Sequence, residues 1–276
     1  MKHKAFLLAA MLFCLTATAQ RQQVVVKHDI RVLPPYGTQI STQGQNQGFA
    51  LLRGPLGTEL AVVLRSGGQY VTYNIRTRKI GRCGTLEGTT SHCNNASATR
   101  RGLLWVSECY GQHRCMVYNT RDNRLMLTHI ISYRGNENWF AYDWCVDERA
   151  GRLYVYGGNM GQSLWIKELP LAKALTAREV EYTADEVLRQ TEIRGIAVPQ
   201  GSLVRNGRAY LLDGDQPGHT YLHVYDLATG QRLLQMPVGG DDLEPEGLDL
   251  RGRWAYISFS EPSRTKLHII RYRLPR

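Results

Sequence analysis

The 276-residue chain lacks most of the signatures that identify an enzyme or a nucleic-acid-binding protein. It has no nucleophile elbow around a serine or cysteine, no phosphate-binding loop and no close cysteine pair that would begin a zinc site. Its arginines are scattered, without a basic run or an aromatic-basic motif, so nucleic acid is not an expected partner. Helical signals are scarce outside residues 171–193. The scarcity of helical signals favours an all-β protein.

Long apolar runs are absent except at the start of the chain. Two lysines precede an apolar run from Ala5 to Leu15, and a small-x-small pattern stands before Gln20. This arrangement predicts a secretory signal peptide over residues 1–19, so we expect a secreted or periplasmic protein without a transmembrane segment. Cys14 leaves a lipoprotein signal as a minor alternative.

Acidic residues are outnumbered by basic ones. The formal net charge is +10, and removal of Lys2 and Lys4 with the signal peptide leaves +8. A basic exported protein favours acidic partners such as sulfated or uronic glycans, teichoic acids and anionic cell surfaces. Solubility alone explains the charge equally well.

Cysteines are few, and five of the six follow the predicted signal peptide. Export permits disulfides. Cys109 and Cys115 flank a turn between two strand-like runs and are a candidate pair, and Cys83 with Cys93 is a second one. Cys145 is then left as a buried thiol.

A unit of roughly fifty residues repeats along the chain, as blades of a propeller do. Each copy has a polar anchor, a first strand, a polar turn, a more apolar second strand and a third strand often rich in tyrosine. The anchors are spaced by 48, 48, 57 and 46 residues, and they are Gln47, Asn95, Asp143, Gln200 and Glu246.

The last copy has three strands, and an unrepeated strand lies at Val24–Leu33. Pairing these two ends would close a ring and cover both sheet edges. We therefore predict a single domain over residues 20–276, an all-β five-bladed β-propeller with four-stranded blades that start near 47, 95, 143, 200 and 246. A β-sandwich would explain the strands but not their recurrence. The longer third copy predicts a small helix near Asp185–Gln190 and a fourth strand within residues 179–186.

In a propeller the anchors would meet around the central channel. Such a ring of amide and carboxylate oxygens could hold water, bind calcium at Asp143 and Glu246, or grip sugar hydroxyls. A purely structural role accounts for the ring equally well. The glycine after three of the anchors would let the backbones pass closely where the ring is crowded.

Three local features bear on chemistry. His92 lies one loop before the axis in "HCNNAS", and Glu244 joins Glu246 in the acidic segment "GGDDLEPEG". Paired carboxylates can act as acid and base on glycosides, or form a calcium site or a solvated loop. Tyr142 and Trp144 flank the anchor Asp143, where aromatic rings suit sugar stacking or a blade core.

Residues 199–250, with "PQGSLV" and "EPEGLDL", resemble blades of five-bladed propellers in phage receptor-binding proteins and in teichoic-acid-associated and helveticin-like secreted proteins. In that group a Gln-Gly pair opens one blade, a Glu-Pro-Glu-Gly stretch opens the next, and a His-x-Asn segment such as residues 92–94 opens another. The resemblance implies attachment to surface polymers or glycans. Five-bladed glycosidases are a second comparison, but they carry three inner carboxylates, whereas this ring has Asp143 and Glu246.

We expect an exported, monomeric protein that recognises a carbohydrate or anionic cell-surface polymer at the mouth of the channel. The alternatives are a glycoside hydrolase-like enzyme that uses Asp143 and Glu246 with help from His92, and a scaffold for protein partners. The expected binding residues are Gln47, His92, Asn95, Tyr142, Asp143, Trp144, Gln200, Glu244 and Glu246.

Overall fold

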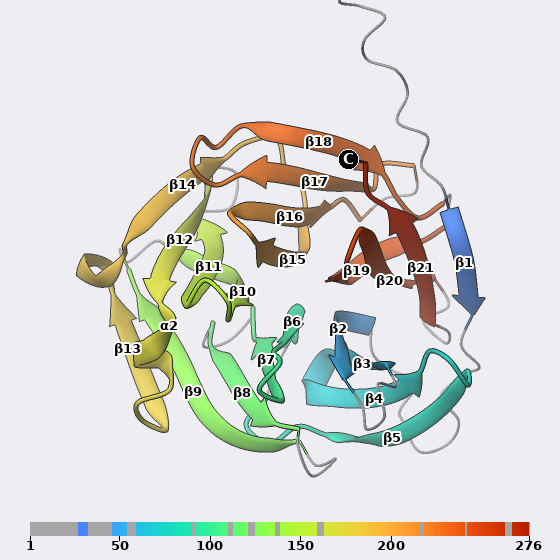
Figure 1. Cartoon of the computed structure of the whole chain (residues 1–276), viewed down its shortest axis with the longest axis horizontal. Helices are drawn as coiled ribbons and strands as arrows, with labels where there is room; N and C mark the ends of the chain where they lie inside the picture. The colour runs from blue at the N-terminus through green and yellow to red at the C-terminus, as the bar shows by residue number, and fades with distance from the viewer. Residues whose placement is uncertain are drawn as a thin grey trace, which may run out of the picture.

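The chain forms a ring of five β-sheets around one axis in a computed structural model (Figure 1). The structure describes residues 27–32, 46–53, 59–89, 92–109, 113–120, 125–135, 139–158, 163–215, 218–240, 242–262 and 267–275, so the predicted signal peptide lies outside the described residues. The innermost strands are β2 (Asn46–Arg53), β6 (Asn95–Ala98), β10 (Phe140–Asp147), β15 (Pro199–Arg205) and β19 (Glu244–Arg251). Each contains one predicted anchor.

Each blade continues outward from its inner strand through antiparallel neighbours. Blade 1 adds β3 (Glu59–Arg65), β4 (Gln69–Asn74) and β5 (Lys79–Thr85), with a 3-10 turn at Ser66–Gly68; blade 2 adds β7 (Leu103–Ser107), β8 (Cys115–Asn119) and β9 (Met126–Arg134). Blade 3 adds β11 (Arg152–Gly158), β12 (Leu164–Pro170) and β14 (Arg189–Ile193). Blade 4 adds β16 (Arg208–Asp213), β17 (Tyr221–Asp226) and β18 (Arg232–Pro237); blade 5 adds β20 (Trp254–Ser260), β21 (Leu267–Arg273) and β1 (Lys27–Val32).

The two ends of the chain close the ring, as the sequence predicts. Strand β1 pairs antiparallel with β21, with Lys27 opposite Tyr272, and Figure 1 shows the two strands side by side. The last blade therefore obtains its fourth strand from the opposite end of the chain, which covers an edge that would otherwise be exposed.

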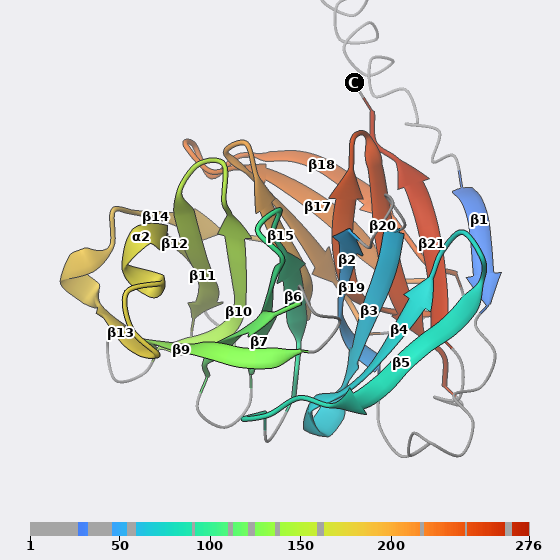
Figure 2. The same ribbon diagram turned by 60° about the horizontal axis from the view of Figure 1, so that its bottom comes forward.

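Blade 2 departs from the predicted four strands. Strand β13 (Glu179–Thr183) pairs in parallel with β9 and gives that sheet a fifth strand (Figure 2). The prediction of blade 3's fourth strand within residues 179–186 is therefore wrong, because β14 takes that place. Val180 and Tyr182 are buried while Glu179 and Glu181 are exposed, which is the alternation of an outer strand.

The predicted helix near Asp185–Gln190 is also wrong. Residues Ala184–Glu186 form a 3-10 turn and the chain is extended again from Arg189, while the short helix α2 (Leu171–Ala174) lies earlier, directly after β12. The capping box that suggested a helix is present, since the Glu186 carboxylate accepts the Thr183 N–H at 2.9 Å. It begins a single turn, because the residues that follow pair with β12. No helix in the described ranges is long and apolar enough to cross a membrane.

The predicted disulfides are not formed: none of the five cysteines in the described part of the chain takes part in a disulfide. Their side chains belong to different packing clusters. Cys115 lies in the core between blades 2 and 3, Cys93 lies in the core between blades 1 and 2, and Cys83 packs in blade 1. Cys109 lies after β7, and its backbone N–H donates to the His92 carbonyl at 3.0 Å. Cys109 therefore does not close a hairpin with Cys115.

Candidate binding site at the channel mouth

The channel mouth is the face of the ring at which the inner strands begin. Because the second strand of each blade runs antiparallel to the first, its last residues reach the same face. Each blade therefore supplies two mouth positions that face each other across a ladder, and the pairs are Asn46 with Arg65, Asn95 with Ser107, Asp143 with Tyr156, Pro199 with Asp213, and Glu244 with Ser260.

The glycines after three anchors are required by the crowding of the inner strands. A Cβ on Gly247 would lie 2.4 Å from the Phe49 nitrogen, and one on Gly201 would lie 2.6 Å from the Gly247 Cα. A Cβ on Gly48 would lie 2.6 Å from the backbone carbon of Asn95. No side chain fits at these distances, which confirms the close approach that the sequence predicts.

Asn95 joins three blades across the axis. Its Nδ2 donates to the Ser202 carbonyl of blade 4 at 2.7 Å and to the Trp144 carbonyl of blade 3 at 3.2 Å. The side chain is fully buried, and its Oδ1 has no hydrogen-bond partner among the described residues. Asn95 is therefore a structural link of the axis and is not itself accessible to a ligand.

Asp143 is a fully buried carboxyl beside that link. Its Oδ1 accepts a hydrogen bond from Asn94 Nδ2 at 2.7 Å, and its Oδ2 has no partner among the described residues. Burial raises the pKa of Asp143 to about 7, although the hydrogen bond from Asn94 opposes the shift. The group can therefore gain or lose a proton near neutral pH.

The anchors of blades 4 and 5 are hydrogen-bonded to their surroundings. Gln200 Nε2 donates to Glu244 Oε1 at 3.1 Å, and the Ser260 hydroxyl donates to Glu246 Oε1 at 2.8 Å. Gln47 in blade 1 has an Oε1 without a partner in the described ranges. The five anchors are between 0% and 7% exposed, so they form the floor of the mouth and not its open surface.

A row of half-buried rings lies on the blade 3 side of the mouth. The centroids of His113 and Phe140 are 3.9 Å apart, and those of Phe140 and Tyr142 are 4.9 Å apart. Tyr142 also approaches Tyr156, with centroids 6.3 Å apart. Trp144 is 1% exposed and packs in the core between blades 2 and 3. Of the two predicted aromatic residues, Tyr142 is half-buried and Trp144 is buried.

Several polar residues of the mouth escape the sequence analysis because they end second strands. Glu108 is buried and pairs with Arg114, with Nε and Oε2 3.2 Å apart. Asp213 accepts two backbone N–H groups at 2.8 and 2.9 Å and contacts His223 Nε2 at 3.2 Å. Their signal in the sequence is an acidic residue that closes an apolar run, as in "LLWVSE" and "AYLLD".

His92 and a calcium ion are the remaining predictions for this site. His92 is half-buried, and burial lowers its pKa, which favours the neutral imidazole. The described residues contain no group of three His, Cys, Asp or Glu side chains arranged to hold a metal ion. Calcium at Asp143 and Glu246 therefore rests on the sequence argument alone.

No protein-family model matches the chain, and no curated protein matches its sequence. Among solved structures, a glutaminyl cyclase from Myxococcus xanthus aligns with a TM-score of 0.54 at 13% identity, over 91% of this chain and 98% of that chain. The Polycomb Repressive Complex 2 of Chaetomium thermophilum aligns with a TM-score of 0.45 at 10% identity, over 79% of this chain and 55% of that chain. The first similarity supports the propeller fold, and the second is too weak to support an inference.

Proposed function

We propose that the protein binds a neutral carbohydrate at the channel mouth. The observation that carries the proposal is the half-buried row of His113, Phe140 and Tyr142 beside polar groups of the anchor ring. Aromatic faces stack on the apolar face of a sugar ring, and neighbouring amides and carboxylates bond its hydroxyls. The resemblance of residues 199–250 to glycan-associated propellers supports the same class of ligand.

The charge of the mouth favours a neutral ligand over an anionic one. Glu108, Asp143, Glu244 and Glu246 lie at this face with the guanidinium groups of Arg65 and Arg114, of which Arg114 pairs with Glu108. Carboxylates accept hydrogen bonds from sugar hydroxyls and repel phosphate, sulfate and other carboxylates. The enclosed floor further favours a ligand that rests on the mouth over one that enters the axis.

A neutral-glycan array followed by calorimetry on the hits tests the proposal. Tyr142→Ala removes the central ring of the row and should weaken binding about tenfold. Tyr210→Ala is the matched control, because Tyr210 is equally half-buried but lies near the opposite end of blade 4. Absence of binding to any neutral glycan, or equal losses in the two variants, would overturn the proposal.

A second candidate is an acid–base enzyme centred on Asp143. Its pKa of about 7 favours this function, because a general acid–base group works best when its pKa is near the working pH. Glycoside hydrolysis would use Asp143 with Glu246 and His92. The name of the Myxococcus xanthus neighbour, a glutaminyl cyclase, adds cyclisation of a glutaminyl group with release of ammonia as a reaction to test.

Two assays separate these reactions from simple binding. Release of reducing sugar from neutral glycosides and release of ammonia from a glutaminyl dipeptide should both be measured across pH 5 to 9. An enzyme would lose activity in Asp143→Asn, and its rate would change around the pKa of that carboxyl. If neither product forms while glycans still bind, the enzyme candidate fails and the binding proposal stands.

A further inference from the structure

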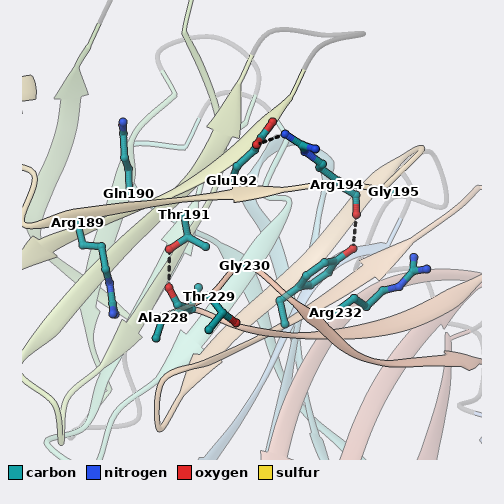
Figure 3. A pocket seen from close by; sticks show the side chains of 12 residues that line it. Arg189, Gln190, Thr191, Glu192, Arg194, Gly195, Ala228, Thr229, Gly230 and Arg232 are labelled. Carbon is teal, nitrogen blue, oxygen red and sulfur yellow. Dashed lines mark hydrogen bonds and ion pairs between the residues drawn. The ribbon is translucent and has the colours of Figure 1, made fainter.

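A groove lies on the outside of the ring between blades 3 and 4, away from the channel mouth. Its volume is about 630 Å³, within the range of small-ligand sites. One wall is the outer strand β14, and the other is the turn at 228–230 between β17 and β18 (Figure 3). The groove thus joins two blades at their outer edges.

Positive charge dominates the lining of this groove. Arg189, Arg194 and Arg232 contribute three guanidinium groups, and Glu192 contributes the one carboxylate of the lining. Arg194 pairs with Glu192, with Nη2 and Oε2 2.6 Å apart. Arg189 shares the Glu168 carboxylate with Arg152. Arg232 makes no ion pair with a carboxylate in the described part of the chain, and it bonds the Tyr225 phenol.

Tyr225 lies between the backbone of Arg194 and the side chain of Arg232. The Tyr225 hydroxyl donates to the Arg194 carbonyl at 2.6 Å and is also in hydrogen-bond contact with Arg232. The Arg232 guanidinium lies against Gly195, where a Cβ would be 3.2 Å from its Nη1. In Figure 3 these two arginines occupy one end of the groove and Arg189 the other.

The walls of the groove are ordered by their own hydrogen bonds. The Asp226 carboxylate accepts the N–H groups of Ala228 and Thr229 at 2.8 and 3.0 Å, and the Gly230 N–H bonds the Asp226 carbonyl at 2.8 Å. The Thr191 hydroxyl donates to the Leu227 carbonyl at 2.7 Å across the groove floor. A site with fixed walls loses little entropy when a ligand enters.

The same contacts argue against an extended peptide. A peptide strand would have to pair with the outer edge of β14. Thr191 already bonds blade 4, and a Cβ on Gly230 would be 3.1 Å from the Glu192 carbonyl, so the turn occupies that edge. A duplex needs a broad basic face, which a groove of this size does not provide.

We propose that this groove is a second binding site, in which Arg232 holds a carboxylate or sulfate group of an acidic oligosaccharide. Planar guanidinium groups bind such oxygens through paired hydrogen bonds. Arg189, Gln190 and Thr229 then contact the next sugar unit along the groove. The inference goes beyond the neutral-sugar site, since the ligand has the opposite electrostatic requirement and meets different blades.

Calorimetry with a sulfated hexasaccharide and with an oligogalacturonate tests the site and distinguishes the two anionic groups. Arg232→Gln should weaken binding of at least one of them about tenfold, because one charge-assisted contact is lost. Arg273→Gln is the matched control, since it removes the same charge from an exposed position on blade 5. It should change the affinity less than about twofold.

Three results would overturn the proposal. The first is that neither acidic oligosaccharide binds. The second is that Arg273→Gln weakens binding as much as Arg232→Gln does. The third is that duplex DNA or polyglutamate binds more tightly than the oligosaccharides, with the same dependence on Arg232. The two sites are tested separately, because Tyr142→Ala should leave acidic binding unchanged and Arg232→Gln should leave neutral binding unchanged. If the protein binds only one of the two ligand classes, neutral or acidic, the proposal for the other class is the one that fails.

Discussion

The channel mouth and the lateral groove handle charge in opposite ways. At the mouth, Asp143 and Glu246 are buried among strands that almost touch, and each is held by a hydrogen bond from a neighbour. In the groove, the Arg194 side chain is 81% exposed. A buried charge must be neutralised or paired, whereas a solvated one costs little to keep. Substitutions at the mouth should therefore change stability, and substitutions in the groove should change binding alone.

The largest expected effect is the pH dependence caused by Asp143. Its pKa is about 7 in the folded protein against an ordinary 3.8, so the folded state retains a proton that the unfolded state releases. This contribution is fully present below about pH 4 and is lost as the pH rises through about 7. Asp143→Asn cannot titrate, so it should gain about 4 kcal/mol over wild type between pH 4 and pH 8.

Urea unfolding at several pH values measures that gain. Glu192→Gln is the groove control, because its carboxylate has a lowered pKa and is ionised in both states above pH 5. Its stability should follow wild type across that range. If the free energy of unfolding has the same pH dependence in Asp143→Asn and wild type, the Asp143 carboxyl is not held in its protonated form.

The next effect concerns the contact between inner strands. Gly247→Ala places a methyl group 2.4 Å from the Phe49 nitrogen, and backbone must move to admit it. We expect a loss of about 3 kcal/mol in the free energy of unfolding. Gly240→Ala, where no atom lies within 4 Å of the added carbon, should be close to neutral in the same urea titration. Equal stabilities would show that the axis is looser than the structure indicates.

A smaller loss is expected when the link across the axis is removed. Asn95→Ala removes the donor to the Ser202 carbonyl and one of two side-chain donors to the Trp144 carbonyl, which keeps the Ser107 hydroxyl, and it should cost about 2 kcal/mol. Ser97→Ala in the same strand removes a buried hydroxyl that has no partner among the described residues, so it should be neutral or stabilising. Thermal unfolding of the two variants side by side makes the comparison, and the opposite order would contradict the assignment.

The smallest effect on stability is expected in the groove. Arg194→Gln breaks an exposed pair with Glu192, and such pairs contribute little because water solvates both partners. The melting temperature should change by less than about 1 °C. A large drop would mean that the arginine supports the blade, and it would remove the distinction between groove and mouth.

The repeat was readable from the sequence because it depends on local patterns. Alternation defines the strands, and Gly201 and Gly247 stand at the positions where the inner strands meet. The ring closure followed from counting strands at the two ends. These features are properties of short segments, so no long-range contact had to be known in advance.

The parts that could not be predicted depend on which blade a segment joins. Residues 179–183 carry a strand pattern, but nothing in those five letters indicates pairing with β9 of the previous blade. Cys109 and Cys115 are close in sequence, yet packing sends their side chains to different places. The groove arginines were counted in the net charge, and the contacts of Tyr225 with the Arg194 backbone and with Arg232 became visible only when blades 3 and 4 were placed together.

The parallel pairing of β13 with β9 has a consequence for how the ring opens. The segment that joins β12 to β14 leaves blade 3, adds a strand to blade 2 and returns. The outer edges of these two blades cannot separate until β13 has detached from β9. Amide protons of β9, β13 and β14 should therefore exchange with solvent in one cooperative event, whereas the other blades can open at their edges one at a time.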